Sequence, residues 1–344
     1  MPSSNLPEKI AVITGDPSCP DPTKLNQRYG PEDLEVHARM RKAFEGIDGL
    51  TSRVFESHAS LFDDLREFQP DLVVNFCDTG LFNRPDQEIH VVTQLELMGL
   101  PYTGAPPRAM LLCYDKQVVR LVAEALGVSV PAEQFVPAGG VANAQVERFP
   151  ALIKPNTADG SVGITKDAVV HDAGEASDYL GWLAEELPDR DVLIQEYLPG
   201  PEYGLGMIGN PETGDLLPLP MLEVDFSGLP EGLAPILSFE SKAEPESPYW
   251  TDIRFRATQL PDMTRESLID AGRRLFRRLS LRDYGRFDYR TAADGTIRLM
   301  EVNPNPAWGW DAKMALMADV AGWTYQQLLE RLVATAWARV RADH

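Results

Sequence analysis

Two carboxylates and one amide in the last third of the chain have the spacing of a metal site. Asp288 and Glu301 flank a turn at Asp294-Gly295, and Asn303 follows two residues later. If Asp294-Gly295 forms a two-residue type I′ turn, Asp288 faces Glu301 and Arg286 faces Asn303 across a hairpin. Because side chains alternate across a strand, these four polar groups would share one face.

The expected hairpin needs a positive charge between its carboxylates. Directly opposed carboxylates repel and weaken strand pairing, and a hard divalent cation offsets that repulsion. Asp288, Glu301 and Asn303 supply the oxygen ligands that Mg²⁺ prefers, with Mn²⁺ as the alternative ion. A solvated hairpin with ordinary surface charges is the competing interpretation. The opposite face would pack into a core through Phe287, Tyr289, Met300 and Val302.

A second set of residues has the character of a phosphate site. Gly160-Ser161-Val162-Gly163 follows an apolar run that contains Lys154. Glycines allow close approach of backbone N–H groups to phosphate oxygens. An ammonium group in an apolar strand is costly unless it is paired, so a phosphate partner would explain Lys154. An edge lysine that reaches solvent is the alternative.

Together these segments resemble the ATP-grasp enzymes, and among them the D-alanine–D-alanine ligases. The resemblance covers most of the chain and rests on segments in the family's order: Tyr114-Asp115-Lys116, Ala151-Leu152-Ile153-Lys154-Pro155, the glycine loop, Leu193 to Glu202, Lys242, and Gly285 to Pro306. It implies an α/β fold. An N-terminal open parallel sheet, Rossmann-like, would precede a two-lobed ATP-grasp fold of α+β character.

The resemblance also implies a reaction and its residues. An ATP-dependent carboxylate–amine ligase would form an amide bond through an acyl phosphate and release ADP and phosphate. Arg286 would stabilise the tetrahedral oxyanion, and Lys242 would approach the γ-phosphate. Lys116 and Lys154 would contact the α- and β-phosphates. The full set implied for ATP is Lys116, Lys154, Gly160, Ser161, Val162, Gln195, Glu196, Leu198, Glu202 and Lys242, with Gln195, Glu196 and Leu198 at the adenine and Glu202 at the ribose.

The substrate regions depart from the family. Thr14 to Cys19 replaces the usual Ser-x-Glu element, and Asn75 to Gly80 replaces a His-Gly element. We therefore expect amino-acid or peptide substrates that are not both D-alanine. Trp308 and Trp310 would either shape a pocket or pack in a core. Further candidate substrate contacts are Asp78, Arg84 and Glu88.

Two other functions stay open on sequence. A divergent cell-wall D-alanine–D-alanine ligase would have to rebuild its missing contacts from Asp16, Asp78 or Glu88. A non-catalytic nucleotide-binding protein is the third interpretation. The presence of every expected phosphate and magnesium ligand argues against it.

The elements that must position these residues follow from apolar patterning. Boundaries are expected near Cys113 and Gly200, which gives an N-terminal domain (1–113), a central ATP-grasp subdomain (114–200) and a C-terminal subdomain with the hairpin (201–344). Asp172 is a candidate N-cap. Strands are expected at Lys9 to Thr14, Ser52 to Phe55, Asp71 to Phe76, Phe149 to Ile153, Ala168 to His171, Asp191 to Tyr197, Glu202 to Gly209, Leu216 to Val224 and Phe239 to Ala243. Helices are expected at Pro31 to Ile47, Leu61 to Phe68, Asp86 to Met98, Lys116 to Leu126, Ala173 to Glu186, Thr264 to Leu279 and Trp323 to Val340.

Composition limits the partners. The 344 residues are 44% hydrophobic and carry a net charge of −20, which argues against nucleic acid or an anionic membrane. Three separated cysteines indicate neither a disulfide framework nor a zinc site. The absence of a signal peptide pattern and of a long apolar run predicts a cytoplasmic protein. The expected partners are small amino-acid or peptide substrates, and a homodimer stays open.

Overall fold

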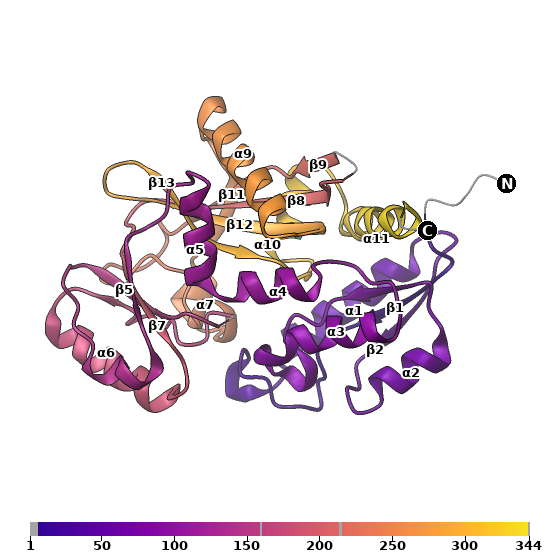
Figure 1. Ribbon diagram of the computed structural model, residues 1–344, viewed down its shortest axis with the longest axis horizontal. Coiled ribbons are helices and arrows are strands. Elements are labelled where there is room, and N and C mark those ends of the chain that lie inside the picture. The colour runs from indigo at the N-terminus through magenta and orange to yellow at the C-terminus, as the bar shows by residue number, and fades with distance from the viewer. Residues whose placement is uncertain (1–5, 159, 213–214, 343–344) are drawn as a thin grey trace.

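Three sheets organise the molecule (Figure 1). The computed structural model describes residues 6–158, 160–212 and 215–342. The first sheet lies in the N-terminal part of the chain, the second in the middle, and the third in the C-terminal part. None of the helices in these ranges combines the length and the apolar character that crossing a bilayer requires.

The first sheet is parallel, as predicted. Its strands β1 (Lys9–Ile13), β2 (Thr51–Phe55) and β3 (Leu72–Asn75) lie in the order β2-β1-β3. Parallel strands need crossover connections, and helices provide them. Those helices are α1 (Pro31–Glu45) and α2 (Leu61–Phe68), and α3 (Glu88–Leu97) follows β3. Short 3₁₀ turns, η1 (Leu25–Gln27), η2 (Leu81–Asn83) and η3 (Pro85–Gln87), fold the loops after β1 and β3.

The second sheet is antiparallel. Its order is β4-β7-β5-β6, from β4 (Glu133–Val136), β5 (Ala151–Pro155), β6 (Val169–Val170) and β7 (Val192–Glu196). Helix α6 (Ala173–Glu186) packs beside it, next to the turn η4 (Ala138–Asn143). The predicted N-cap is confirmed, because the Asp172 carboxylate accepts from the backbone N–H groups of Gly174 and Glu175 at 2.8 and 3.0 Å.

The third sheet carries the hairpin. It is antiparallel, in the order β11-β10-β8-β12-β13, with β9 paired to β8. Its strands are β8 (Glu202–Asn210), β9 (Asp215–Pro218), β10 (Leu222–Asp225), β11 (Arg254–Ala257), β12 (Asp283–Thr291) and β13 (Ile297–Asn303). The helices of this part are α7 (Glu240–Ala243), α8 (Pro248–Thr251), α9 (Asp262–Arg278), α10 (Lys313–Val320) and α11 (Tyr325–Ala342).

The strand predicted at Phe239 to Ala243 is wrong. The backbone N–H groups of Lys242 and Ala243 both bond to the carbonyl of Phe239, at 2.9 and 3.0 Å, and close a helical turn that forms α7. Glu240 to Ala243 lacks the β-branched side chains that favour a strand. The consequence is that Lys242 reaches its neighbours from a short helix.

Two helices connect the first sheet to the rest. The sequence prediction missed α4 (Pro107–Tyr114), which packs with α5 (Lys116–Ala125) against β13 of the third sheet. One apolar core joins α3, α4 and α5 to the apolar face of β12 and β13. A second core joins β1 and β3 to α10 and α11. The third sheet is therefore anchored to the N-terminal part of the molecule on both sides of the hairpin.

Candidate active site

The hairpin has the predicted pairing at its functional end. Asp288 lies opposite Glu301, and Arg286 lies opposite Asn303. The predicted two-residue turn is wrong. Gly295 N bonds to Ala292 O at 3.0 Å, and Ala292 N bonds to Thr296 O at 2.8 Å, so the loop has three residues. Gly295 occupies the left-handed region, with φ +81°, as such a loop requires.

A bulge reconciles the longer turn with the predicted register. The three-residue loop places Tyr289 opposite Leu299, and the register shifts between Asp288 and Tyr289. Met300 is the extra residue at that shift. It was expected on the same face as Phe287, and this is wrong: Met300 lines the cleft and packs against the core of the second sheet, while Leu299 is buried in its place. The bulge keeps Glu301 on the same face as Asp288.

Cations surround the two carboxylates. The Arg286 guanidinium holds Asp288 with two N–H donors, Nε to Oδ1 at 3.0 Å and Nη2 to Oδ2 at 2.9 Å, and Lys313 Nζ lies 3.5 Å from Oδ1. Burial alone would raise the pKa of Asp288, but Arg286, Lys313 and Lys242 outweigh it and hold that pKa well below its usual range. The pKa of Glu301 is also lowered, because nearby Lys116 and Lys242 outweigh burial and the charge of Asp288.

The oxygen donors at the hairpin fit a magnesium ion. Asn303 lies between the carboxylates, with Nδ2 3.2 Å from Asp288 Oδ2 and 3.4 Å from Glu301 Oε1. A half-turn of this amide would present its oxygen instead. No cluster of three or more His, Cys, Asp or Glu side chains that could hold a metal occurs within the described ranges. Two carboxylates plus an amide match Mg²⁺, which takes one or two carboxylates and completes its shell with water and phosphate.

A cavity of about 110 Å³ lies beside the hairpin, between the second and third sheets. The side chains that line it include Asp288 and Glu301 and the predicted lysines Lys116, Lys154 and Lys242. We call it the cleft. This set can neutralise a polyanion and a divalent cation together.

Lys154 is the most buried of these lysines, with 3% of its surface exposed. Burial, together with the charge of Lys116, lowers its pKa to about 8 against the opposing effect of Glu301. A phosphate group in the cleft would stabilise the charged form. The ammonium of Lys116 donates to the carbonyl of Ala158, just before the glycine loop, at 2.5 Å.

The glycine loop divides between two cavities. Ser161 lines the cleft, and its hydroxyl donates to the carbonyl of Leu237 at 3.0 Å. Val162 lines a different, apolar cavity. Gly160 faces the loop after β1, where a Cβ atom would lie 2.8 Å from Thr23 Cγ2. The loop therefore closes against the N-terminal part of the chain.

The predicted adenine residues fall into two groups. Gln195 pairs with Leu152 and so shares the face of Lys154. Its Nε2 donates to Glu133 Oε2 at 3.0 Å, and its Oε1 is buried with no hydrogen-bond partner among the described residues, although Gln195 does not line the cleft itself. The Glu196 carboxylate is ion-paired to Arg298 of the hairpin, and Leu198 is also buried without lining the cleft.

Glu202 lines the cleft but is already held by cations. Lys313 Nζ lies 3.2 Å from its Oε1, and Arg290 Nη1 lies 3.7 Å from its Oε2. Sequence reasoning missed Arg290 and Lys313, which both line the cleft. Strand alternation from Arg286 and Asp288 points to Arg290 as the next residue on that face. Lys313 begins α10 and carries no comparable signal in the sequence.

The candidate substrate residues are dispersed. Asp78 lines a cavity of about 220 Å³ at the carboxyl ends of β1 and β3, and Trp308 lines the same cavity. Glu88 is buried near the end of β13. Arg84 is exposed and pairs with Asp86 at 3.2 Å. Trp310 lies on the surface, with the Arg39 guanidinium 3.7 Å from its ring centre.

Asp16 was one of the residues expected to bind D-alanine in a divergent ligase. In the structure its carboxylate is hydrogen-bonded by neighbouring residues instead. One carboxylate oxygen accepts from the N–H and hydroxyl groups of Ser18, at 2.8 and 2.6 Å, and the other accepts from His58 N at 2.9 Å. These bonds lower its pKa despite burial. Asp16 thus stabilises the loop after β1.

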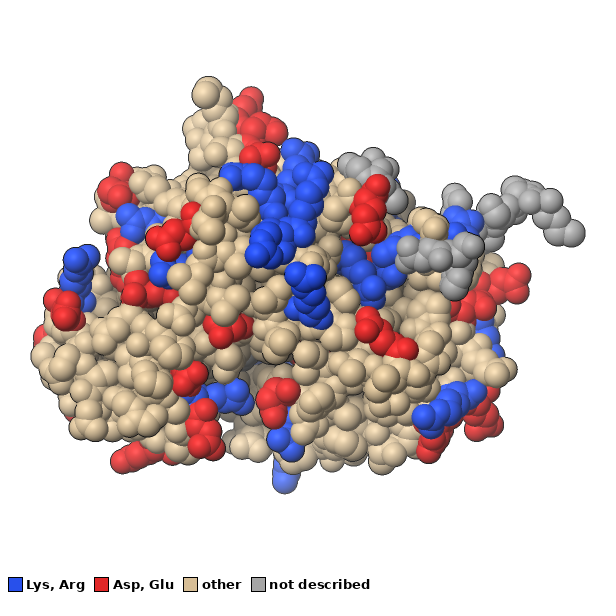
Figure 2. Space-filling view, viewed as in Figure 1, with Lys and Arg blue, Asp and Glu red and all other residues tan. Residues whose placement is uncertain are grey.

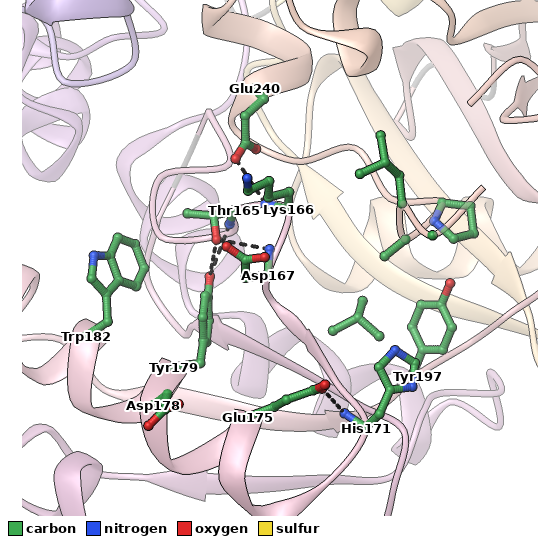
Figure 3. Close-up of a pocket in the computed structure, with 15 residues that line it drawn as sticks. Thr165, Lys166, Asp167, His171, Glu175, Asp178, Tyr179, Trp182, Tyr197 and Glu240 are labelled. Atoms are coloured by element: carbon green, nitrogen blue, oxygen red, sulfur yellow. Dashed lines mark hydrogen bonds between the residues drawn. The ribbon is translucent and has the colours of Figure 1, made fainter. Parts of the chain in front are cut away.

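A larger cavity, of about 900 Å³, lies elsewhere (Figure 3). Its described lining residues come from the segment around Lys166, from helix α6, from the segment that ends at Glu240, and from Tyr197 after β7, and none belongs to the predicted site. The Tyr179 hydroxyl accepts from Thr165 N at 3.1 Å across one wall. We place no chemistry there.

Comparison with known proteins supports one family. A family model described as D-ala D-ala ligase C-terminus matches residues 138–334. The chain is 28% identical to the D-alanine–D-alanine ligase of Bordetella petrii, over 93% of this chain and 94% of that protein. It is 30% identical to the vancomycin C-type resistance protein VanC1 of Enterococcus gallinarum, over 70% of this chain and 67% of that protein.

The fold agrees with these relatives. The crystal structure of a D-alanine–D-alanine ligase from Bacillus anthracis, complexed with ATP, superposes with a TM-score of 0.69 at 20% identity, covering 98% of this chain and 99% of that one. The predicted α/β fold of an N-terminal parallel sheet followed by an ATP-grasp part is confirmed. The chain belongs to the D-alanine–D-alanine ligase family and is an ATP-grasp ligase that forms carbon–nitrogen bonds.

Proposed function

We propose that this ligase joins the carboxylate of one amino acid or short peptide to the amine of another. The observation that carries the proposal is the convergence of Lys116, Lys154 and Lys242 with Asp288 and Glu301 on one small cleft. Phosphoryl transfer depends on positioning and charge neutralisation. This set provides both without a protein nucleophile.

The reaction needs two steps. A carboxylate oxygen of the first substrate attacks the γ-phosphorus of ATP, the bond to the bridging oxygen breaks, and ADP leaves. The amine then attacks the acyl phosphate, the carbon–nitrogen bond forms, phosphate leaves and the amine loses a proton. Each product is one water lighter than its two substrates together.

The residues of the cleft have distinct proposed roles. Lys116 and Lys154 hold the α- and β-phosphates, and Lys242 approaches the γ-phosphate. Outside the cleft, on the same face of the second sheet as Lys154, Gln195 Oε1 accepts from the adenine amino group. Asp288, Glu301 and Asn303 would hold Mg²⁺, which supplies charge neutralisation when bound. Arg286 already lies beside Asp288 and is the donor we assign to the tetrahedral oxyanion.

One experiment tests this proposal. The purified protein is incubated with Mg²⁺-ATP and pools of D- and L-amino acids and short peptides, while phosphate release and product masses are followed. We expect phosphate release matched by a condensed product, and a loss of at least about 100-fold in Glu301→Gln. Absence of phosphate release with every pool would contradict the proposal.

D-alanine as both substrates is the second candidate. The relative from Bordetella petrii, which is named a D-alanine–D-alanine ligase, aligns over 93% of this chain. Against this, Asp16 is engaged within its own loop. A dipeptide of D-alanine formed in preference to all other products would favour this candidate.

A further inference from the structure

Three carboxylates of the cleft lie in a row on neighbouring strands. Glu202 belongs to β8, Asp288 to β12 and Glu301 to β13, and these strands are adjacent in the third sheet. All three side chains line the cleft. Asp288 pairs with Glu301 on one side and with Gly204, two residues from Glu202, on the other. The row therefore has two intervals, one on each side of Asp288.

A different group lies in each interval. Between Glu202 and Asp288, the Lys313 ammonium lies 3.2 Å from Glu202 Oε1 and 3.5 Å from Asp288 Oδ1. Between Asp288 and Glu301, the Asn303 amide nitrogen lies 3.2 Å from the first carboxylate and 3.4 Å from the second. Lys313 thus brings a fixed positive charge to the first interval, whereas Asn303 brings a neutral group to the second.

The fold makes room for Lys313 in this place. Lys313 begins α10 and lies next to Gly204, where a Cβ atom would be 3.7 Å from Lys313 Cδ and 3.5 Å from Asp288 Oδ1. Many charged side chains lie on the surface, as Figure 2 shows for one face. In contrast, only 11% of the Lys313 side chain is exposed. Buried charges of this kind depend on each other, because removal of one leaves its partners uncompensated.

The two groups differ in what they offer a metal ion. The Asn303 amide can turn and present its oxygen as a ligand. An ammonium has no acceptor atom and carries a like charge, so Lys313 keeps a divalent cation out of the first interval. Many phosphoryl-transfer sites use two metal ions to neutralise charge. In this cleft the chain itself supplies one of the two cations.

We propose that Lys313 replaces a second metal ion, so that this ligase acts with one Mg²⁺ per active site. The ion binds between Asp288 and Glu301, and the Lys313 ammonium holds Asp288 and Glu202 from the other side. Lys313 is a positioning residue in this role, because it acts through these two carboxylates. This inference rests on the proposed function.

Counting bound ions gives the first test. The protein is mixed with one equivalent of a non-hydrolysable ATP analogue, and Mn²⁺ is added while electron paramagnetic resonance follows the free ion. Mn²⁺ is a suitable probe because it takes the same oxygen ligands as Mg²⁺. We expect one bound Mn²⁺ per chain, held more tightly than by the analogue alone.

Lys313→Met gives the second test, with Lys42→Met as the matched control. Methionine keeps an unbranched stem and removes the charge, so Glu202 and Asp288 are left to attract a divalent ion. We expect Lys313→Met to bind two Mn²⁺ ions. Mn²⁺ should also raise its melting temperature by on the order of 5 °C more than that of the unmodified protein. Lys42 is exposed in the last turn of α1, so Lys42→Met should match the unmodified protein in both measurements.

The outcomes separate this inference from the proposed function. Two Mn²⁺ ions bound by the unmodified protein would overturn the inference. So would one ion and an unchanged Mn²⁺ effect in Lys313→Met, the result expected if Lys313 only packs α10 against the sheet. Neither result affects the ligase proposal, which phosphate release with the substrate pools tests separately. The count in the unmodified protein stands even if Lys313→Met fails to fold.

Discussion

Trp308 and Trp310 lie two residues apart and occupy different environments. Trp308 is 4% exposed, stacks on Phe76 at a centroid distance of 5.4 Å and meets the Tyr284 ring edge-on at 4.4 Å. Trp310 is 36% exposed, and the Arg39 guanidinium lies over its ring. The first packs the interface between β3 and the third sheet, and the second covers part of α1.

These environments predict that replacing the two tryptophans lowers the free energy of unfolding by different amounts. Trp308→Ala should lower the free energy of unfolding by about 3–5 kcal/mol, because it leaves a large cavity in a packed core. Trp310→Ala should cost about 0.5–1 kcal/mol, the value of an exposed cation–π contact. Urea unfolding of both variants measures the difference. Equal effects would mean that Trp308 is not part of the core.

Lys154 predicts a pH dependence of nucleotide binding. Its pKa in the free protein is about 8, lowered by burial, and bound phosphate favours the protonated form. The affinity for Mg²⁺-ATP should therefore be constant below pH 7 and fall as pH rises through 8. Calorimetric titrations from pH 6.5 to 9.5 would show this. Lys154→Met should bind more weakly with no step near pH 8, and a flat profile in the unmodified protein would refute the assignment.

At the scale of elements, the hairpin depends on one glycine. Gly295 has φ +81°, and no atom of the described residues lies within 4 Å of the position that a Cβ would take, so a substitution there tests backbone strain alone. Gly295→Ala should lower the free energy of unfolding by about 1 kcal/mol. Gly181→Ala, in the middle of α6 with equal space around it, should raise it by about 0.5–1 kcal/mol. Denaturant unfolding compares the two, and a neutral Gly295→Ala would contradict the turn.

Some features of the strands and helices can be predicted from the sequence, and others cannot. Opposed Asp288 and Glu301 can be predicted because alternation and pairing are local rules. The three-residue turn and the bulge at Met300 compensate for each other, so the predicted register is right although the predicted turn is wrong. Helix α7 is missed because four residues carry too little periodicity for a strand and a helix to be distinguished.

Contacts between segments that are far apart in the chain could not be predicted from the sequence. Lys313 reaches Glu202 and Asp288 only because α10 packs over β8. Glu88 and Asn305 are separated by 217 positions and meet through the packing of α3 and α4 on the third sheet. The resemblance to a family supplies the lysines and the order of the motifs. It cannot supply the contact between Glu88 and Asn305, which depends on tertiary structure.

At the scale of the whole molecule, the cleft is built from two sheets and closed by a third part. Lys154 comes from the second sheet, Asp288 comes from the third, and the glycine loop meets the N-terminal part at Thr23. A ligand that bridges these parts should stabilise them together. We therefore expect Mg²⁺-ATP at 100 times its Kd to add about 2.7 kcal/mol to the free energy of unfolding.

Removal of the metal tests this linkage. With EDTA present, the same ATP concentration should give a much smaller increase in the unfolding temperature, because Asp288 and Glu301 would then repel the phosphates. Asp288→Asn and Glu301→Gln provide the matched variants. An increase that is independent of both EDTA and these substitutions would place nucleotide binding away from the hairpin.

The most direct test of carboxylate activation follows an oxygen atom. The acyl donor is labelled with ¹⁸O in its carboxylate, and the released phosphate is examined by mass spectrometry after turnover with Mg²⁺-ATP and the amine. Activation through an acyl phosphate moves one carboxylate oxygen to phosphorus, so each phosphate should carry one ¹⁸O atom. Phosphate released without label would contradict carboxylate activation by this ligase.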